Sequence, residues 1–510
     1  MNASPSLFSS HLNEWFQMPT ESSVAAFARA QVELYRHNPT LQDYFLPLQL
    51  SFCKNRTIDP VPQSLSRRIY ASSCRMGSKV FRRVSRRKIK VDVLLCPMLN
   101  FQRRTENQFL MRMFTGLVQT GASILCLLPQ GAPCRAEMES WLRAEGRKNQ
   151  VIFWDLSSIS NPLAARMLSI LGRSSGAQMF NEIVEVLRPH GMAPAIDSQS
   201  GFFYTAAHAE SWRFFEHDIE FDAVVTRCHW QTLCSAVCQT ARQRGKPVIT
   251  FQQGVIGHTL DVPVLASKFV AFGDSSARFL AQMNRSFYQA VNRAEPVVEF
   301  IPGGCLFDTI PSLPGQFLKQ TLLIFDEPVG PDDFYGIRPQ RDAVLQLAER
   351  VLETCASARI IIRPHPYWDS MGLGFWKDLV RKYPNRCELS HAAWTLEEDL
   401  SRSSVALGVF SGALTIASGA GLPTFFMVAD SGYKTKDLAS FEKGQLCMPE
   451  AAFDQISRVL TNAQAHAEAG FMALKNARDY YANGANLEMS PAFFERLLHP
   501  TASPSVARQE

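Results

Sequence analysis

Short apolar runs alternate along most of the chain with amphipathic stretches of roughly 10–15 residues, the pattern of a parallel sheet covered by helices. In the first half, the runs that predict strands lie at 91–97, 123–129, 151–155, 221–226, 247–251 and 269–272. The stretches that predict helices lie at 107–120, 136–146 and 231–243. This half is therefore expected to form one α/β domain.

A second α/β series follows a segment rich in glycine and proline, from Pro302-Gly-Gly to Pro314-Gly315. Strands are predicted at 321–325, 359–362, 405–409 and 424–428, and helices at 340–355, 396–401, 414–419, 452–478 and 491–498. We therefore predict an α/β fold of two doubly wound Rossmann-type domains facing across a cleft. The expected parts are an extension (1–88), a first domain (89–310), a second domain (311–480), and a helix with a tail (481–510).

The composition is that of a globular protein, with 46% hydrophobic and 19% charged residues in 510. The net charge of +5 does not indicate a nucleic-acid partner. The longest uncharged stretch, 403–429, contains four glycines and Pro423, so it predicts strand, loop and helix rather than a membrane span.

Twelve cysteines without a CxxC pair, and a start without a secretory signal, predict reduced thiols in the cytoplasm. Cys228, His229, Cys234 and Cys238 cluster on an apolar helix, which favours core packing over a metal site.

The extension contains a helical pattern at 24–37 and then a strongly basic segment. Ten Lys and Arg residues and no acidic residue stand between Arg67 and Lys90, with apolar residues at near-helical spacing. This pattern suits a helix on an anionic membrane surface at the cytoplasmic face. A solvated basic face, or one that contacts an anionic ligand, would give the same pattern.

Arg363-Pro-His365-Pro366 ends an apolar strand. Each proline drives the residue before it into extended conformation, so Arg363 and His365 are placed just beyond the carboxyl end of the strand. Open α/β sheets bind ligands at this edge, and a cation with an imidazole can receive a phosphate there. A simple turn is the alternative.

Ser411-Gly412 also follows a strand and opens a short helix that contains Thr415. The amides and the dipole of a helix N-terminus suit a phosphate, and capping of the helix by Ser411 uses the same geometry. We expect this loop and the His365 loop to share one sheet edge.

Two further loops follow strands. Gln252-Gln253-Gly254 leads to His258, which is a candidate general base or a structural residue. Asp326 and Glu327 are candidates for binding ribose hydroxyls or stabilising positive charge, or else for capping a turn. The sequence does not distinguish between these two carboxylates.

His365-Pro366, the Ser411 loop and Gly421-Leu-Pro423 together resemble bacterial surface-polysaccharide glycosyltransferases of the GT-B architecture. The first two are similar to the "HP" and "SS" motifs of enzymes that use CMP-activated sugars, sialic acid or Kdo. The resemblance covers roughly residues 220–430. It implies that Arg363, His365, Pro366, Ser411, Gly412 and Thr415 bind the nucleotide.

This sequence departs from such enzymes in two respects. Gly412 replaces the second serine of the "SS" motif, and Ile416 stands where retaining enzymes that use sugar diphosphates place a ribose-binding glutamate. No Asp-x-Asp motif follows a strand, so neither a metal nor another cofactor is expected.

The resulting hypothesis is a metal-independent glycosyltransferase of capsule or lipopolysaccharide biosynthesis, cytoplasmic or peripheral at the inner membrane face. Its partners would be a nucleotide-sugar donor and a glycan or glycolipid acceptor, the latter near Gln252, Gln253, Gly254 and His258. A CDP-polyol phosphotransferase and a non-catalytic assembly scaffold are the alternatives.

Overall fold

The computed structural model describes residues 23–41, 88–97, 104–128, 132–154, 175–190, 208–209, 211–212, 215–229, 232–252, 254–256, 261–305, 316–327, 337–365, 373–391, 394–428, 435–482 and 487–499. The basic segment 67–87 lies outside these residues, as do Gln253, His258 and Pro366. Among the described residues, no helix has both the length and the apolar character required to cross a bilayer.

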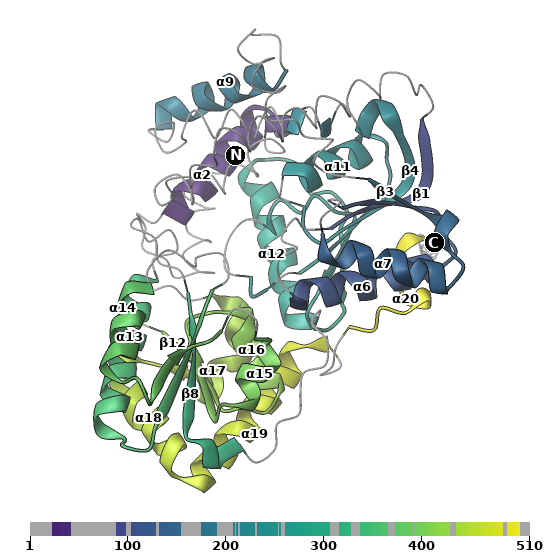
Figure 1. The fold of residues 1–510 in the computed structure, drawn as a ribbon. Coiled ribbons are helices and arrows are strands. Elements are labelled where there is room, and N and C mark those ends of the chain that lie inside the picture. The colour runs from purple at the N-terminus through teal and green to yellow at the C-terminus, as the bar shows by residue number, and fades with distance from the viewer. Residues whose placement is uncertain are drawn as a thin grey trace, which may run out of the picture.

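Seven parallel strands form the sheet of the first domain, in the order β3-β2-β1-β4-β5-β6-β7 (Figure 1). These strands are β1 (Ile89–Cys96), β2 (Ile124–Leu127), β3 (Val151–Trp154), β4 (Ile219–Thr226), β5 (Val248–Phe251), β6 (Lys268–Ala271) and β7 (Glu299–Pro302). The helices of this part are α2 (Ser23–His37), α6 (Arg104–Gln119), α7 (Pro133–Ala144), α9 (Ser175–Leu187), α11 (Thr232–Gln243) and α12 (Asp274–Ala290).

Six parallel strands form the second sheet, in the order β10-β9-β8-β11-β12-β13. They are β8 (Thr321–Asp326), β9 (Arg359–Pro364), β10 (Cys387–Leu389), β11 (Val405–Gly408), β12 (Thr424–Met427) and β13 (Leu446–Cys447). The helices are α13 (Arg338–Thr354), α14 (Leu373–Lys382), α15 (Leu396–Ser401), α16 (Gly412–Gly419), α17 (Glu442–Gln445), α18 (Pro449–Thr461) and α19 (Ala463–Tyr480), with the 3-10 helix η8 (Lys436–Phe441).

Both sheets are doubly wound, because each grows first to one side of its first strand and then to the other. The chain changes direction between β1 and β4 in the first sheet and between β8 and β11 in the second. The predicted fold class, a GT-B-like pair of Rossmann-type domains, is confirmed. Ligands of such sheets bind beyond the carboxyl ends of the strands at this switch point.

The strands form because their residues are almost wholly apolar, as a sheet covered on both faces requires. Ile360, Ile361 and Ile362 of β9 are all buried, and Ile361 packs on the opposite face from its two neighbours. One face packs against α13, α14 and α18, and the other against α15, α16 and α19.

Apolar packing continues from one domain into the other. Phe272, at the carboxyl end of β6, lies 6.0 Å from the ring of Tyr480 on α19, and Tyr480 lies 5.1 Å from Phe441. These three aromatic rings are buried. Fully burying such a side chain contributes about 1.5–3 kcal/mol, so the interface stabilises a fixed arrangement of the two domains.

After α19 the chain returns to the first domain. The Ala482 amide donates to the Phe272 carbonyl at 2.7 Å, and helix α20 (Pro491–Leu498) packs on α6 (Figure 1). Gly116 of α6 permits this contact, because a Cβ there would lie 2.3 Å from the Met489 carbonyl oxygen. The sequence predicts the last helix but not its return.

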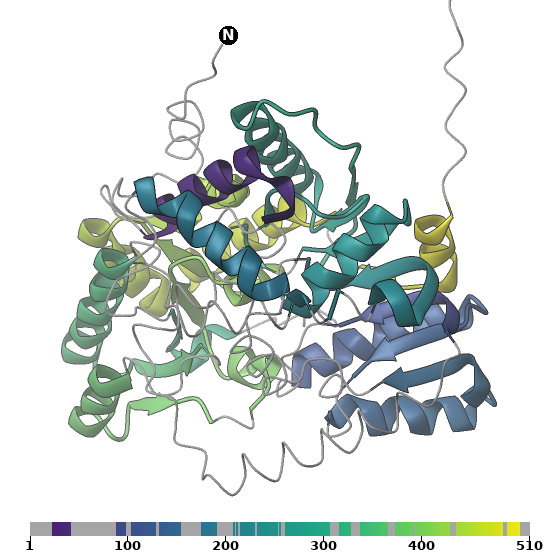
Figure 2. The same cartoon turned by 90° about the horizontal axis from the view of Figure 1, so that it is seen from above.

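The helix expected near the start of the chain is α2, which pairs with α9 beside the first domain (Figure 2). Tyr35 packs edge-on against Phe287 and Tyr288 of α12. The Arg36 guanidinium donates to the Ala290 carbonyl at 3.0 Å, a favourable site for a cation because it is a helix C-terminus. These contacts fix α2 against α12.

Candidate functional site at the facing carboxyl edges

The switch point of the second sheet brings three of the predicted loops together. β8 lies between β9 and β11, and all three are parallel, so Glu327, His365 and Ser411 follow strand ends at the same edge. Glu327 is buried, whereas His365 is half-buried. The expectation that the His365 and Ser411 loops share one edge is confirmed by this topology.

Ser411 is the N-cap of α16, and its hydroxyl accepts a hydrogen bond from the Ala413 amide at 3.3 Å. Gly408 makes the approach to this helix possible. A Cβ at Gly408 would lie 2.9 Å from Leu414 Cδ1 and 3.0 Å from the Phe325 carbonyl oxygen. The α16 N-terminus is thus held close against the end of β8, as an anion site at the switch point requires.

Thr415 is fully buried, and its hydroxyl lies 2.6 Å from the Tyr481 hydroxyl and donates to the Gly412 carbonyl at 2.7 Å. These contacts anchor α16 to the segment that returns to the first domain. The two contacts of the Thr415 hydroxyl argue for a structural role of this residue. Nucleotide binding by Thr415 stays a prediction, and its buried position does not support it.

Arg363 joins the end of β9 to α15. One of its guanidinium nitrogens, Nη1, contacts the Asp399 carboxylate and also lies 3.3 Å from the Trp394 and Thr395 carbonyl oxygens. Asp399 is fully buried and also accepts from the Ser390 hydroxyl at 2.6 Å. The charge of Arg363 is therefore largely matched by Asp399, which favours a role in positioning the loops over direct contact with a phosphate.

Asp326 ends β8 and Glu327 follows it, and both carboxylates are buried. Asp326 forms a bidentate pair with Arg341 of α13, at 2.9 Å to Nε and 3.3 Å to Nη2. Both side chains are nearly buried, so this pair ties β8 to α13. The pairing argues for a structural role of Asp326, and the proposed role of Glu327 at this edge stays a prediction.

The first domain presents the loop 252–256 to the same region. A Cβ at Gly412 would lie 3.6 Å from Gly254 Cα, so the predicted acceptor loop and the α16 N-terminus meet across the domain interface. Gln252 is buried, and its amide donates to the Gly254 carbonyl at 2.8 Å and accepts from the Phe272 amide at 2.8 Å. Gln252 therefore shapes the loop from within.

Asp437 of η8 clamps this loop from the second domain. Its carboxylate accepts from the Ile256 amide at 2.8 Å, the Tyr480 hydroxyl at 2.7 Å and the Ser276 hydroxyl at 2.5 Å. Thr435 adds a bond to the Ile256 carbonyl at 2.6 Å. Both backbone groups of Ile256 are thus held by side chains of the second domain, which fixes the loop opposite Ser411.

Asp437 has a second carboxylate nearby. Burial raises the pKa of Asp437 from its usual 3.8 to about 6, against the hydrogen bonds that lower it. Burial and then the repulsion of Asp437 raise the pKa of Asp261 from 3.8 to about 7. The interface therefore contains two carboxyls that titrate near neutrality, and Asp261 lies three residues after the predicted base His258.

Sequence reasoning missed Asp261 and Asp437. The sequence offers one weak signal: Thr435 stands two residues before Asp437, and threonine is a common helix cap. In the structure the Thr435 hydroxyl accepts a hydrogen bond from the Asp437 amide at 3.2 Å. Among the described residues, no group of three or more His, Cys, Asp and Glu could hold a metal. Cys228, His229, Cys234 and Cys238 are all buried in the core of the first domain.

No family model and no curated protein sequence matches this chain. Solved structures similar to it include trehalose 6-phosphate synthase from Burkholderia multivorans, 11% identical over 81% of this chain and 98% of that chain, with a TM-score of 0.47. A UDP-GlcNAc 2-epimerase from Neisseria meningitidis, bound to UDP-GlcNAc, is 12% identical over 80% and 100%, with a TM-score of 0.45. MurG from Acinetobacter baumannii is 12% identical over 78% and 96%, with a TM-score of 0.41.

Likenesses this distant carry no argument about activity. The residues at the two facing edges are therefore the basis for a function.

Proposed function

We propose that this protein is a glycosyltransferase that moves a sugar from a nucleotide-sugar to a glycan or glycolipid acceptor of the bacterial surface. The sequence motifs favour a CMP-sugar of the Kdo or sialic acid type. The observation that carries the proposal is the meeting of the Ser411-capped α16 N-terminus with the Gly254 loop at the second sheet's switch point. A donor held by one domain there faces an acceptor held by the other.

In this proposal the α16 amides and His365 receive the phosphate of the donor. Departure of the nucleotide places negative charge on that phosphate and positive charge on the sugar. Hydrogen bonds to the phosphate that become stronger as the nucleotide leaves therefore lower the barrier. One hydrogen-bonding group of this kind typically raises the rate by ~10²–10³-fold. Arg363, paired with Asp399, would hold the loop that carries His365.

The acceptor hydroxyl needs a base if the reaction inverts the anomeric centre. His258 keeps this role as a prediction, with Asp261 as a second candidate because its pKa of about 7 suits proton transfer near neutral pH. Glu327, buried at the end of β8, would stabilise positive charge on the sugar. We expect no metal to take part, as the sequence motifs indicate.

The direct test is release of CMP from CMP-Kdo and CMP-sialic acid, compared with release from CDP-polyols. His365→Ala should reduce CMP release about 10²-fold, and Ser411→Ala should reduce it and weaken the α16 cap by about 1 kcal/mol. His217→Ala is the matched control, because His217 is exposed on another part of the first domain.

Cleavage of a CDP-polyol instead of a CMP-sugar would replace the proposal by polyol-phosphate transfer. If no donor releases CMP and no nucleotide changes the thermal stability of the protein, the non-catalytic assembly scaffold is the alternative that remains.

A further inference from the structure

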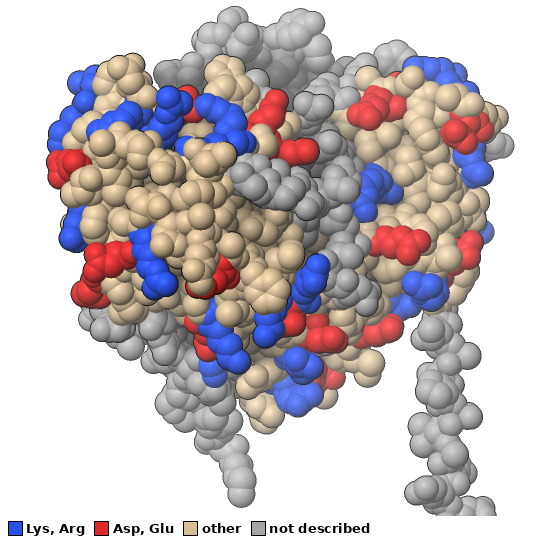
Figure 3. All heavy atoms as spheres, turned by 90° about the horizontal axis from the view of Figure 1, so that it is seen from below, with Lys and Arg blue, Asp and Glu red and all other residues tan. Residues whose placement is uncertain are grey.

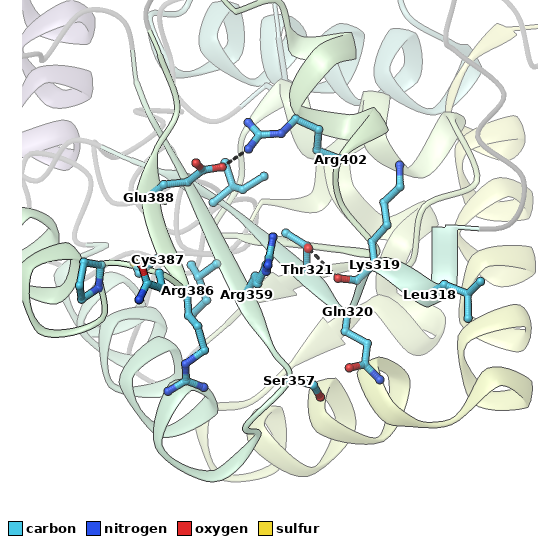
Figure 4. Close-up of a pocket in the computed structure, with 14 residues that line it drawn as sticks. Leu318, Lys319, Gln320, Thr321, Ser357, Arg359, Arg386, Cys387, Glu388 and Arg402 are labelled. Carbon is cyan, nitrogen blue, oxygen red and sulfur yellow. Dashed lines mark hydrogen bonds and ion pairs between the residues drawn. The ribbon is translucent and has the colours of Figure 1, made fainter.

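A pocket of about 570 Å³ lies at the amino edge of the second sheet, among residues that precede or begin β8, β9 and β10 (Figure 4). The candidate donor site lies at the opposite, carboxyl edge. β9 has six residues, each rising about 3.3 Å, so the two edges are separated by roughly 20 Å. The pocket is therefore a separate site, of a volume that small-molecule sites commonly have.

The pocket exists because α15 is too short to cover this face of the sheet. Its six residues extend about 9 Å, less than half the length of β9. Asp399, its fourth residue, meets Arg363 at the carboxyl end of β9. Arg402, the C-cap residue of α15, lines the uncovered part.

The lining is strongly basic. It contains Lys319, Arg359, Arg386 and Arg402 against one carboxylate, Glu388. An excess of cations around a polar hollow attracts an anion, because each charge–charge contact strengthens away from bulk water.

Two of these cations have a fixed structural partner. Lys319 donates to the Ser401 carbonyl. Arg386 donates to the Leu352 carbonyl at 2.6 Å and the Cys355 carbonyl at 3.1 Å, at the C-terminal end of α13.

Arg359 and Arg402 have donors left for a ligand. The Arg359 side chain is exposed in the middle of the lining residues, and within the described part of the chain no hydrogen bond or ion pair engages its guanidinium (Figure 4). Arg402 points toward Glu388 and lies over the Trp394 ring at 4.2 Å, but its Nη1 is buried without a hydrogen-bond partner among the described residues. Buried N–H groups of this kind normally have an acceptor.

We propose that this pocket binds a sugar that carries a phosphate or carboxylate group, with the anion on Arg359 and Arg402. Gln320, Ser357 and Asn385 in the lining supply amide and hydroxyl partners for sugar hydroxyls. The lining includes no aromatic side chain on which a nucleobase would stack. A polyhydroxylated anion therefore fits the lining better than a nucleotide does.

Seen from below, Lys and Arg side chains gather in a row along the upper left margin of the molecule, and elsewhere on this face they stand among Asp and Glu (Figure 3).

The test is calorimetric titration of the full chain with glucose 6-phosphate, glucuronate and inorganic phosphate. Arg359→Gln should weaken binding of the preferred sugar acid about tenfold, the loss of one charge-assisted hydrogen bond. Glu388→Gln should strengthen it about threefold, because it frees Arg402 from its carboxylate. Arg458→Gln, an exposed arginine of α18 outside the lining, should leave it unchanged.

Arg359→Gln is expected to weaken binding and Glu388→Gln to strengthen it. Damage to the fold would weaken binding in both variants, so the opposite effects identify a binding role. CMP should not displace the ligand, so this result is independent of the donor site. Preference for glucose 6-phosphate or for glucuronate identifies the anion. Equal affinity for inorganic phosphate, no binding of any probe, or an Arg359→Gln variant that binds like the wild type would overturn the proposal.

Discussion

Asp437 offers the sharpest test of how the two domains hold the candidate site, through the substitution Asp437→Asn. Asparagine keeps the shape of the side chain, an acceptor for the Ile256 amide and the Tyr480 hydroxyl, and a donor for Ser276. It removes only the buried charge. The variant should therefore retain the clamp on the loop and lose the part of the pH dependence of stability that is due to Asp437.

The magnitude follows from the raised pKa of Asp437, from 3.8 to about 6. The folded state holds this proton more tightly than the unfolded state, so stability rises as the pH falls through that range. At pH 8 the ionised carboxylate costs about 3 kcal/mol relative to a carboxyl with an ordinary pKa, and about half of this is recovered by pH 5. The higher pKa of Asp261 adds an effect of the same sign.

The assay is thermal unfolding between pH 5 and pH 8 for wild type, Asp437→Asn and the control Asp342→Asn, whose carboxylate is exposed on α13. Wild type should gain a few degrees as the pH falls. Asp437→Asn should be more stable than wild type at pH 8 and show a smaller gain, while Asp342→Asn should follow wild type. An asparagine variant that is less stable at pH 8 and keeps the full gain would refute the reasoning about the buried charge.

Two other substitutions test the packing of the second sheet by urea unfolding. Gly408→Ala should destabilise the protein by about 1–3 kcal/mol, because its Cβ would meet Leu414 and Phe325, whereas Gly374→Ala, with nothing within 4 Å, should cost nothing. Equal effects would contradict the close approach of α16 to β8. Arg363→Met should cost about 3–5 kcal/mol by leaving Asp399 buried without its cation, and adding Asp399→Asn should recover part of that loss. No recovery in the double variant would show that the pair is not the cause.

The strands and their common edge could be predicted because they depend on local pattern. Three consecutive isoleucines in β9 and the run Val405–Leu407 in β11 indicate buried parallel strands, and parallel strands place their carboxyl ends together. The glycine at 408 and the serine at 411 then define the start of α16 by their own geometry.

The partners of the charged residues could not be predicted in the same way. Asp399 is separated from Arg363 by 36 residues and Asp437 from Ile256 by 181, and no spacing rule connects such positions. The sequence predicts Arg363 as a cation open to a ligand at the end of a strand, but the short helix α15 brings a buried carboxylate to it. Long-range packing, rather than local propensity, decides which cation remains available to a ligand.

The central claim is that a nucleotide binds where the α16 N-terminus, His365 and the Gly254 loop converge. A thermal-shift panel of CMP, CDP, UDP and GDP on wild type and His365→Ala tests it most directly. At 100 times its dissociation constant CMP should stabilise the wild type by about 2.7 kcal/mol, more than the other nucleotides do, and should stabilise His365→Ala much less. Equal responses of the two proteins to CMP, or no response of the wild type to any of the four nucleotides, would contradict the claim.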